Sequence, residues 1–87
     1  MNLGQHEDAI ISDLATAQKF KFMVHSQKGG WDSKDLDTLS FELAREMKEL
    51  KEKLNDFQGG EASKEEVISE CADVANYLAM IIEKVKK

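Results

Sequence analysis

Apolar residues recur along this chain at intervals of three and four, which is the spacing of helices that bury one face. The pattern is interrupted at two glycine pairs, Gly29-Gly30 and Gly59-Gly60, and the chain contains no proline. Because paired glycines favour turns and proline would break a helix, the pattern predicts three long helices separated at these pairs. We expect the helices at residues 6–28, 33–57 and 62–86, with residues 1–5 loosely held.

The first two predicted helices differ in how their apolar residues are arranged. The first has two apolar stripes about 100° apart, which indicates contact with two neighbours. These stripes are Ile10, Leu14, Ala17 and Val24, and Ile11, Ala15 and Phe22. The second helix gathers its apolar residues within an arc of about 80°. They are Leu36, Leu39, Leu43, Met47, Leu50, Leu54 and Phe57.

The third predicted helix is apolar on nearly every side between Cys71 and Ile82. It opens on a capping box, Ser63-Lys64-Glu65-Glu66. A helix that is apolar all round is buried all round, and two neighbouring helices cannot enclose it. We therefore expect an all-α fold of three long helices per chain that dimerises into a four-helix-type bundle, as a dimer or a dimer of dimers.

Composition narrows the class of protein. A chain of 87 residues with 41% hydrophobic and 33% charged residues suits one small globular domain. A net charge of −5 without a basic patch disfavours binding to a nucleic-acid polymer. No apolar run of about 20 residues and no targeting or lipidation pattern is found, so we expect a cytoplasmic protein that does not insert into membranes. The lone Cys71 excludes an internal disulfide and predicts a buried, inert thiol.

Four carboxylates form two pairs with the same spacing, Glu46 with Glu49 and Glu70 with Asp73. Residues three apart share a helix face, so each pair aims both acids in one direction. The short connection at residues 58–61 favours antiparallel packing of the second and third helices, which would bring the pairs together. Such acids would repel one another, and a bound hard divalent cation usually offsets that repulsion. Oxygen-only ligands favour Mg²⁺, with Mn²⁺ as a substitute, over zinc.

A plainer interpretation of the same residues stays open. Glu46 and Glu49 border the apolar face of their helix among lysines, which is typical of a solvated helix surface. Glu70 lies near the start of its helix, where an exposed acid is common. Asp73 fits this interpretation less well because its neighbours are apolar. A ferritin-like di-iron site is disfavoured, since neither acidic pair contains a histidine.

The order and spacing of these acids resemble the all-α nucleoside triphosphate pyrophosphohydrolases of the MazG type. That family carries the motif EExxE, a gap and then ExxD. The matching stretches here are Arg45-Glu46-Met47-Lys48-Glu49 and Glu70-Cys71-Ala72-Asp73. The runs Lys28-Gly29-Gly30-Trp31 and Asp73-Val74-Ala75-Asn76-Tyr77 also look like those of small phage- or cassette-type members. The resemblance covers roughly residues 10–83.

The resemblance implies hydrolysis of a (deoxy)nucleoside triphosphate to the monophosphate and pyrophosphate, as house-cleaning of the nucleotide pool. Magnesium held by the four acids would bind the phosphates and activate a water, and Glu46 or Glu49 would accept its proton. Substrate contacts are implied at Phe22 and Trp31 for the base, Asn76 and Tyr77 for sugar or phosphate, and Lys28 or Lys53 for the phosphate tail. Similar proteins assemble as dimers or tetramers with pockets between subunits. Phe22 as a core residue, and the lysines as solvated ones, are the plainer alternatives.

Arg45 stands where the family motif begins with a glutamate. If that glutamate only supports the others, activity survives. If it helps to hold a second ion, this protein binds one magnesium or works slowly. Two further functions therefore stay open, namely a catalytically weak relative that binds nucleotides or a partner protein, and a plain helical oligomerisation module with solvated acids.

Overall fold

The computed structural model describes residues 4–26 and 33–86, and within them it contains three α-helices and no strand. The helices are α1 (Gln5–Ser26), α2 (Leu36–Gln58) and α3 (Lys64–Lys86). The predicted all-α fold of three long helices is confirmed. The first helix begins one residue earlier than predicted, and its predicted end at residue 28 lies outside the described residues.

Two side-chain caps determine where α2 and α3 begin. Asp35 Oδ1 accepts a 2.8 Å hydrogen bond from the backbone N–H of Thr38, so α2 begins directly after Asp35 rather than at residue 33. Ser63 and Glu66 form the predicted capping box, in which each side chain accepts from the other residue's backbone N–H at 3.2 Å. This box starts α3 directly after Ser63 rather than at residue 62.

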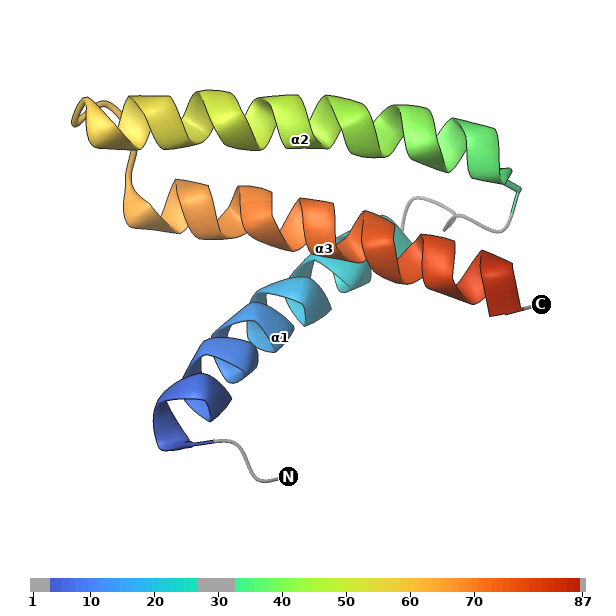
Figure 1. Ribbon diagram of the computed structural model, residues 1–87, viewed down its shortest axis with the longest axis horizontal. Helices are drawn as coiled ribbons and strands as arrows, with labels where there is room; N and C mark the ends of the chain where they lie inside the picture. The colour runs from blue at the N-terminus through green and yellow to red at the C-terminus, as the bar shows by residue number, and fades with distance from the viewer. Residues whose placement is uncertain (1–3, 27–32, 87) are drawn as a thin grey trace.

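Helices α2 and α3 lie side by side and run in opposite directions (Figure 1). The glycine pair between them makes the reversal. Gly59 N–H donates to the carbonyl of Asn55 at 3.1 Å, and Gly60 has a φ of 80°, which a residue without a Cβ adopts without strain. The antiparallel packing expected from the short connection is confirmed, and it places the middle of α2 opposite the first half of α3.

Helix α1 packs on α3 and not along α2. It crosses α3 obliquely, and its N-terminal half projects away from the α2–α3 pair (Figure 1). Among the described residues, α1 and α2 have no Cα atoms within 8 Å of each other. Ile10 and Ile11, which belong to different predicted stripes, are 56% and 54% exposed. In the single chain α1 therefore packs along one helix rather than the two that its stripes predict.

The three helices meet in a small apolar cluster. Its buried members are Leu39, Tyr77 and Met80, with Phe22, Leu43 and Ile81 packed against it. Leu39 comes from the predicted apolar face of α2 and is fully buried. The core is thus built where the Phe22 side chain of α1 packs against the cluster that α2 and α3 form between them.

Much of the remaining apolar surface is open. Met47 and Phe57 on α2 and Leu78 and Ile82 on α3 are exposed, although all four lie on stretches predicted to be buried. The reason is geometric, since α3 covers only part of the α2 face and the oblique α1 covers only part of α3. No helix in the described part of the chain has the length and apolar run that crossing a bilayer requires.

Candidate metal centre

Three of the four predicted acids meet where α2 and α3 face each other. Glu46, Glu49 and Glu70 each contribute a carboxylate oxygen, and these oxygens all lie within 4.8 Å of one another. Glu46 and Glu49 are one turn apart on α2, and Glu70 reaches them from α3. Antiparallel packing has brought the Glu46–Glu49 pair and Glu70 of the second pair into one group of oxygens, which we call the acidic cluster. A group of this size and composition suits a hard divalent cation.

Two oxygens of the acidic cluster are buried without a hydrogen-bond partner in the described structure, namely Glu46 Oε2 and Glu70 Oε2. A buried carboxylate oxygen without a donor costs about 1–3 kcal/mol or more, and a bound cation or proton would remove that cost. Glu49 is exposed, so the acidic cluster is open to solvent on its α2 side. A hollow of about 260 Å³ adjoins it there. The hollow is lined by Glu49, Glu52, Lys53, Asp56 and Glu70.

Burial and neighbouring negative charges raise the affinity of Glu46 and Glu70 for protons. Burial, followed by the charges of Glu49 and Asp73, raises the pKa of Glu46 to about 7. Burial and the charge of Asp73 also raise the pKa of Glu70, while Lys21 and Lys53 oppose the rise. Near neutral pH Glu46 is therefore only partly ionised, which reduces the negative charge of the acidic cluster. A divalent cation would compete with protons for the same oxygens.

Asp73, the fourth predicted ligand, lies beside the acidic cluster and is engaged by α1. Lys21 Nζ lies 3.3 Å from both Oδ1 and Oδ2 of Asp73. The charge of Asp73 still reaches the acidic cluster, because it raises the pKa of Glu46 and of Glu70. Sequence reasoning missed Lys21, which belongs to no motif and is brought here only by the packing of α1 on α3.

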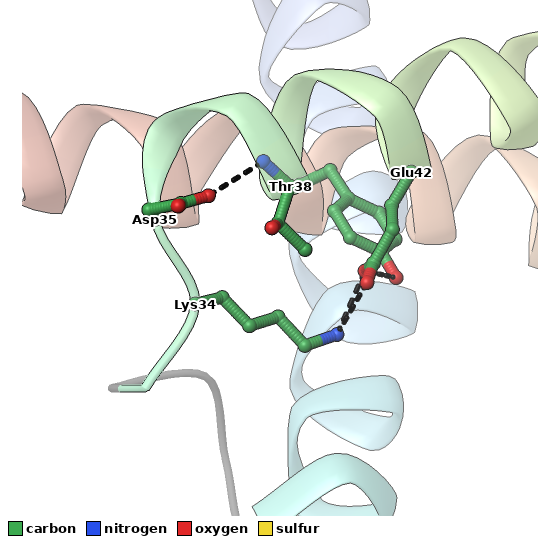
Figure 2. A network of polar contacts seen from close by, with 5 residues as sticks. Lys34, Asp35, Thr38 and Glu42 are labelled. Atoms are coloured by element: carbon green, nitrogen blue, oxygen red, sulfur yellow. Dashed lines mark hydrogen bonds and ion pairs between the residues drawn. The ribbon is translucent and has the colours of Figure 1, made fainter.

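A second polar network lies one turn before Glu46 on α2. Lys34 Nζ donates to both oxygens of Glu42, at 2.9 and 2.7 Å (Figure 2). The Tyr77 hydroxyl donates to Glu42 Oε2 at 2.7 Å. The hydrogen bonds from Lys34 hold the pKa of Glu42 below its usual value, whereas burial and Glu42 raise the pKa of Tyr77 to about 12. Tyr77, predicted to contact sugar or phosphate, thus directs its hydroxyl proton to Glu42.

Two further residues that were predicted to contact the substrate, Asn76 and Phe22, lie between α1 and α3. Asn76 is only 1% exposed, its amide donates to the carbonyl of Gln18 at 3.3 Å, and its Oδ1 has no partner in the described structure. Phe22 is half-buried against the apolar cluster, in agreement with the plainer alternative of a core residue. Both residues therefore take part in the packing of α1 on α3.

Lys53 is the predicted phosphate contact that lies next to the acidic cluster. It lines the hollow beside Glu70, and its Nζ lies 4.0 Å from the Glu66 carboxylate. The other two predicted contacts, Lys28 and Trp31, lie outside the described residues. Lys53 is therefore the one predicted contact that the described residues place at this hollow.

Cys71 differs from its prediction as a buried thiol. It is half-buried and lines a hollow of about 360 Å³ between α1 and α3. The other lining residues are Ile10, Asp13, Leu14 and Ile68. The oblique course of α1 leaves this side of α3 partly uncovered, which explains the exposure.

Comparisons of the chain with protein-family models, with curated protein sequences and with solved structures each found no match. What the site can do therefore follows from its own residues. Its ligands are carboxylates on two rigid helices, part of their oxygen surface is buried and unpaired, and one side opens to a hollow that contains a lysine. Such a site suits a hard cation and an anionic ligand that the cation and the lysine bind together.

Proposed function

We propose that this protein is a magnesium-dependent hydrolase that cleaves (deoxy)nucleoside triphosphates to the monophosphate and pyrophosphate. The observation that supports this most is the convergence of Glu46, Glu49 and Glu70 within 4.8 Å across two helices. The buried, unpaired oxygens of Glu46 and Glu70 add to it. The MazG-type resemblance of the sequence supplies the reaction class, and house-cleaning of the cytoplasmic nucleotide pool is the role that we propose.

Each residue of the site has a distinct part in the proposed reaction. Glu46, Glu49 and Glu70 would hold the ion, with Asp73 joining them from the same face of α3. Bound magnesium, or manganese in its place, neutralises phosphate charge and lowers the pKa of a coordinated water. Glu49 is the exposed acid of the cluster, so it is best placed to accept a proton from an attacking water. Lys53 would pair with the phosphate tail.

We also propose that the protein works as a homo-oligomer. The chain exposes 6600 Å², whereas a compact monomer of 9.8 kDa would expose about 5200 Å². Its radius of gyration is 14.4 Å, against about 12 Å for a compact domain of this length. The excess surface of about 1400 Å² is more than the roughly 800 Å² that each partner buries in a typical stable interface.

A second copy of the chain is the occupant that best fits this surface. Exposed apolar side chains lie on all three helices, and those of the projecting half of α1 and of α3 are ones that a twofold-related chain could cover together. They include Ile10, Ile11, Ile68, Leu78 and Ile82. We expect a dimer or tetramer in light scattering coupled to gel filtration. A monomer at all concentrations would contradict the oligomer without bearing on the acidic cluster.

Two observations favour a second function, a relative that binds nucleotides without turning them over. Arg45 is exposed in place of the first motif glutamate, and Asp73 is paired with Lys21. Both features leave three free acids rather than five, which suits one ion better than two. Nucleotide binding would then persist while hydrolysis is slow.

The test is a pyrophosphate-release screen across ribo- and deoxyribonucleoside triphosphates, with Mg²⁺, with Mn²⁺ and with a chelator. We expect release only with a divalent ion. Glu46→Gln and Glu70→Gln should each lower the rate by about 10²-fold or more, because loss of a carboxylate ligand weakens the hold on the ion that activates the water and neutralises the phosphates. Glu61→Gln, in the exposed turn between α2 and α3, is the matched control and should be unaffected.

Three outcomes separate the alternatives. Release that survives chelation, or that is unchanged in both cluster variants, contradicts the proposed chemistry. Thermal stabilisation by a nucleotide and Mg²⁺ without turnover favours the binding relative. No turnover and no stabilisation by any nucleotide favours the plain oligomerisation module.

A further inference from the structure

The ammonium group of a lysine, Lys21, lies at the edge of the acidic cluster. Lys21 extends from α1 to α3 and contacts both carboxylate oxygens of Asp73 at 3.3 Å. The two side chains are only 25% and 17% exposed, so the pair is partly withdrawn from water. The charge of Lys21 also reaches the acidic cluster, where it lowers the pKa of Glu70 against the effect of burial.

Lys21 nevertheless leaves the centre of the acidic cluster unsatisfied. The buried oxygens Glu46 Oε2 and Glu70 Oε2 have no hydrogen-bond partner among the described residues. The ammonium group is thus committed to one acid at the edge, and the three converging oxygens are left for another cation or a proton. A divalent ion that recruited Asp73 as well would have to displace Lys21 or bind close to its positive charge.

We propose that Lys21 is a tethered counter-cation that competes with the divalent ion for Asp73, and thereby sets the metal concentration at which the site fills. This inference rests on the proposed function, because it assumes that the acidic cluster binds a divalent ion. Two like charges near one carboxylate repel each other strongly in a partly desolvated site. Coordination of the ion by Asp73 therefore requires that Lys21 be displaced, which lowers the affinity of the site and raises the metal concentration at which it fills.

The role assigned to Lys21 is one of positioning and not of catalysis. While Lys21 holds Asp73, the ion has Glu46, Glu49 and Glu70 as its protein ligands. When Asp73 is released, the fourth carboxylate becomes available. Because Lys21 lies on α1 and the ligands lie on α2 and α3, filling of the site is also coupled to how α1 sits on α3.

The test measures binding of the metal alone. Mg²⁺ affinity is determined by calorimetry, and Mn²⁺ affinity by the electron paramagnetic resonance signal of the free ion. Both are measured at pH 8.0, above the pKa of about 7 for Glu46, so that proton competition is small. Lys21→Met removes the charge and keeps the aliphatic stem, and it should tighten metal binding about tenfold.

Three control variants separate the proposed role from others. Lys21→Arg retains the charge and should keep the affinity of the unmodified protein. Lys19→Met removes the same charge from an exposed position on α1 and should leave the affinity unchanged within about twofold. In an Asp73→Asn background the gain from Lys21→Met should largely disappear, because the carboxylate under competition is gone.

A second measurement needs no variant. Selective ¹⁵N and ¹³C labelling of lysine in the unmodified protein allows the Lys21 side chain to be followed by NMR during a Mg²⁺ titration. We expect the Lys21 Nζ and Cε signals to shift in step with metal binding while the Lys19 signals do not. This measurement decides the question even where Lys21→Met fails to fold.

The outcomes are distinguishable from those for the proposed function. Metal binding that requires Glu46 and Glu70 but is unchanged or weakened by Lys21→Met, with Lys21 signals that do not move, overturns the role of Lys21 alone. No metal binding by the unmodified protein or by any variant overturns the proposed function together with it. Tighter binding by Lys21→Met alone, with no gain from the controls, supports the inference.

Discussion

The Tyr77 hydroxyl donates a 2.7 Å hydrogen bond to Glu42 Oε2 and so ties α3 to α2 one helical turn before Glu46. The same carboxylate accepts two hydrogen bonds from Lys34, so it is held in place from both sides (Figure 2). Hydrogen bonds to an ionised acceptor are shorter and stronger than neutral ones. This network fixes the spacing of α2 and α3 next to the acidic cluster.

Titration of Tyr77 tests this network directly. Tyr77 is the single tyrosine of the chain, so the absorbance change at 295 nm reports its phenol alone. We expect a midpoint near 12, because burial and the charge of Glu42 favour the neutral phenol. Glu42→Gln should lower the midpoint toward the ordinary value of about 10. Ellipticity at 222 nm, recorded in parallel, shows whether the helices are still folded, and a midpoint near 10 in the folded protein would contradict the network.

The stability of the metal-free protein should fall as pH rises from about 4.5 to 7. The pKa of Glu46 is about 7 when folded and near 4.5 when unfolded, so the folded state binds more protons throughout this interval. Above pH 7 Glu46 is ionised, and in this partly buried site its charge is repelled by the charges of Glu49 and Asp73, which destabilises the folded state. Thermal unfolding at pH 5 and pH 8 measures the difference.

Glu46→Gln should remove most of that dependence on pH. At pH 8 it should raise the melting temperature by about 5 °C, since it replaces a repelled charge with a neutral amide. Saturating Mg²⁺ should also stabilise the unmodified protein at pH 8 and not the variant. Glu61→Gln is the control and should behave as the unmodified protein does. Equal melting temperatures at both pH values would count against a strained acidic cluster.

Leu39 should be the most costly apolar side chain of α2 to truncate. It is fully buried where all three helices meet, and Leu39→Ala should lower the free energy of unfolding by about 3 kcal/mol. Phe41→Ala removes a larger side chain that is 73% exposed, and it should cost under about 1 kcal/mol. Urea unfolding at one fixed protein concentration compares the two. A larger loss from Phe41→Ala would show that Phe41 is buried by another chain.

The capping box at the start of α3 should contribute measurably to stability. Ser63→Ala removes the acceptor for the Glu66 N–H and should cost about 1 kcal/mol. Ser40→Ala, at an exposed position inside α2, is the matched control. It should be neutral or slightly stabilising, because alanine has the higher helix propensity. Chemical unfolding of both variants measures the contrast, and equal losses would mean that the cap contributes little.

Local features of the fold were predictable because they depend on neighbours in sequence. The Ser63–Glu66 box and the turn at the second glycine pair lie within a few residues of the helix ends that they determine. The predicted starts at residues 33 and 62 were early by two or three residues, because Asp35 and Ser63 act as caps rather than as parts of the helices. Capping and turn residues therefore locate the ends of these helices more accurately than the spacing of apolar residues does.

The site was predictable in part. The spacing of Glu46, Glu49 and Glu70, with a short turn between their helices, was enough to predict that these acids converge. The Lys21 contact to Asp73 and the Lys34–Glu42–Tyr77 network were not predicted. No sequence pattern links those residues, and contacts across separate helices depend on the angle and register at which the helices pack.

The sequence alone determined three helices, the capping box of α3 and two acidic pairs, because helix formation and turn chemistry act over short stretches of chain. Tertiary packing decided the rest. The antiparallel α2–α3 pair aligned the acids, and the oblique α1 delivered Lys21 to Asp73 while leaving much apolar surface uncovered. The physical reason is that side chains far apart in sequence meet only where the contact faces of whole helices fit, and that fit is a property of all three helices together.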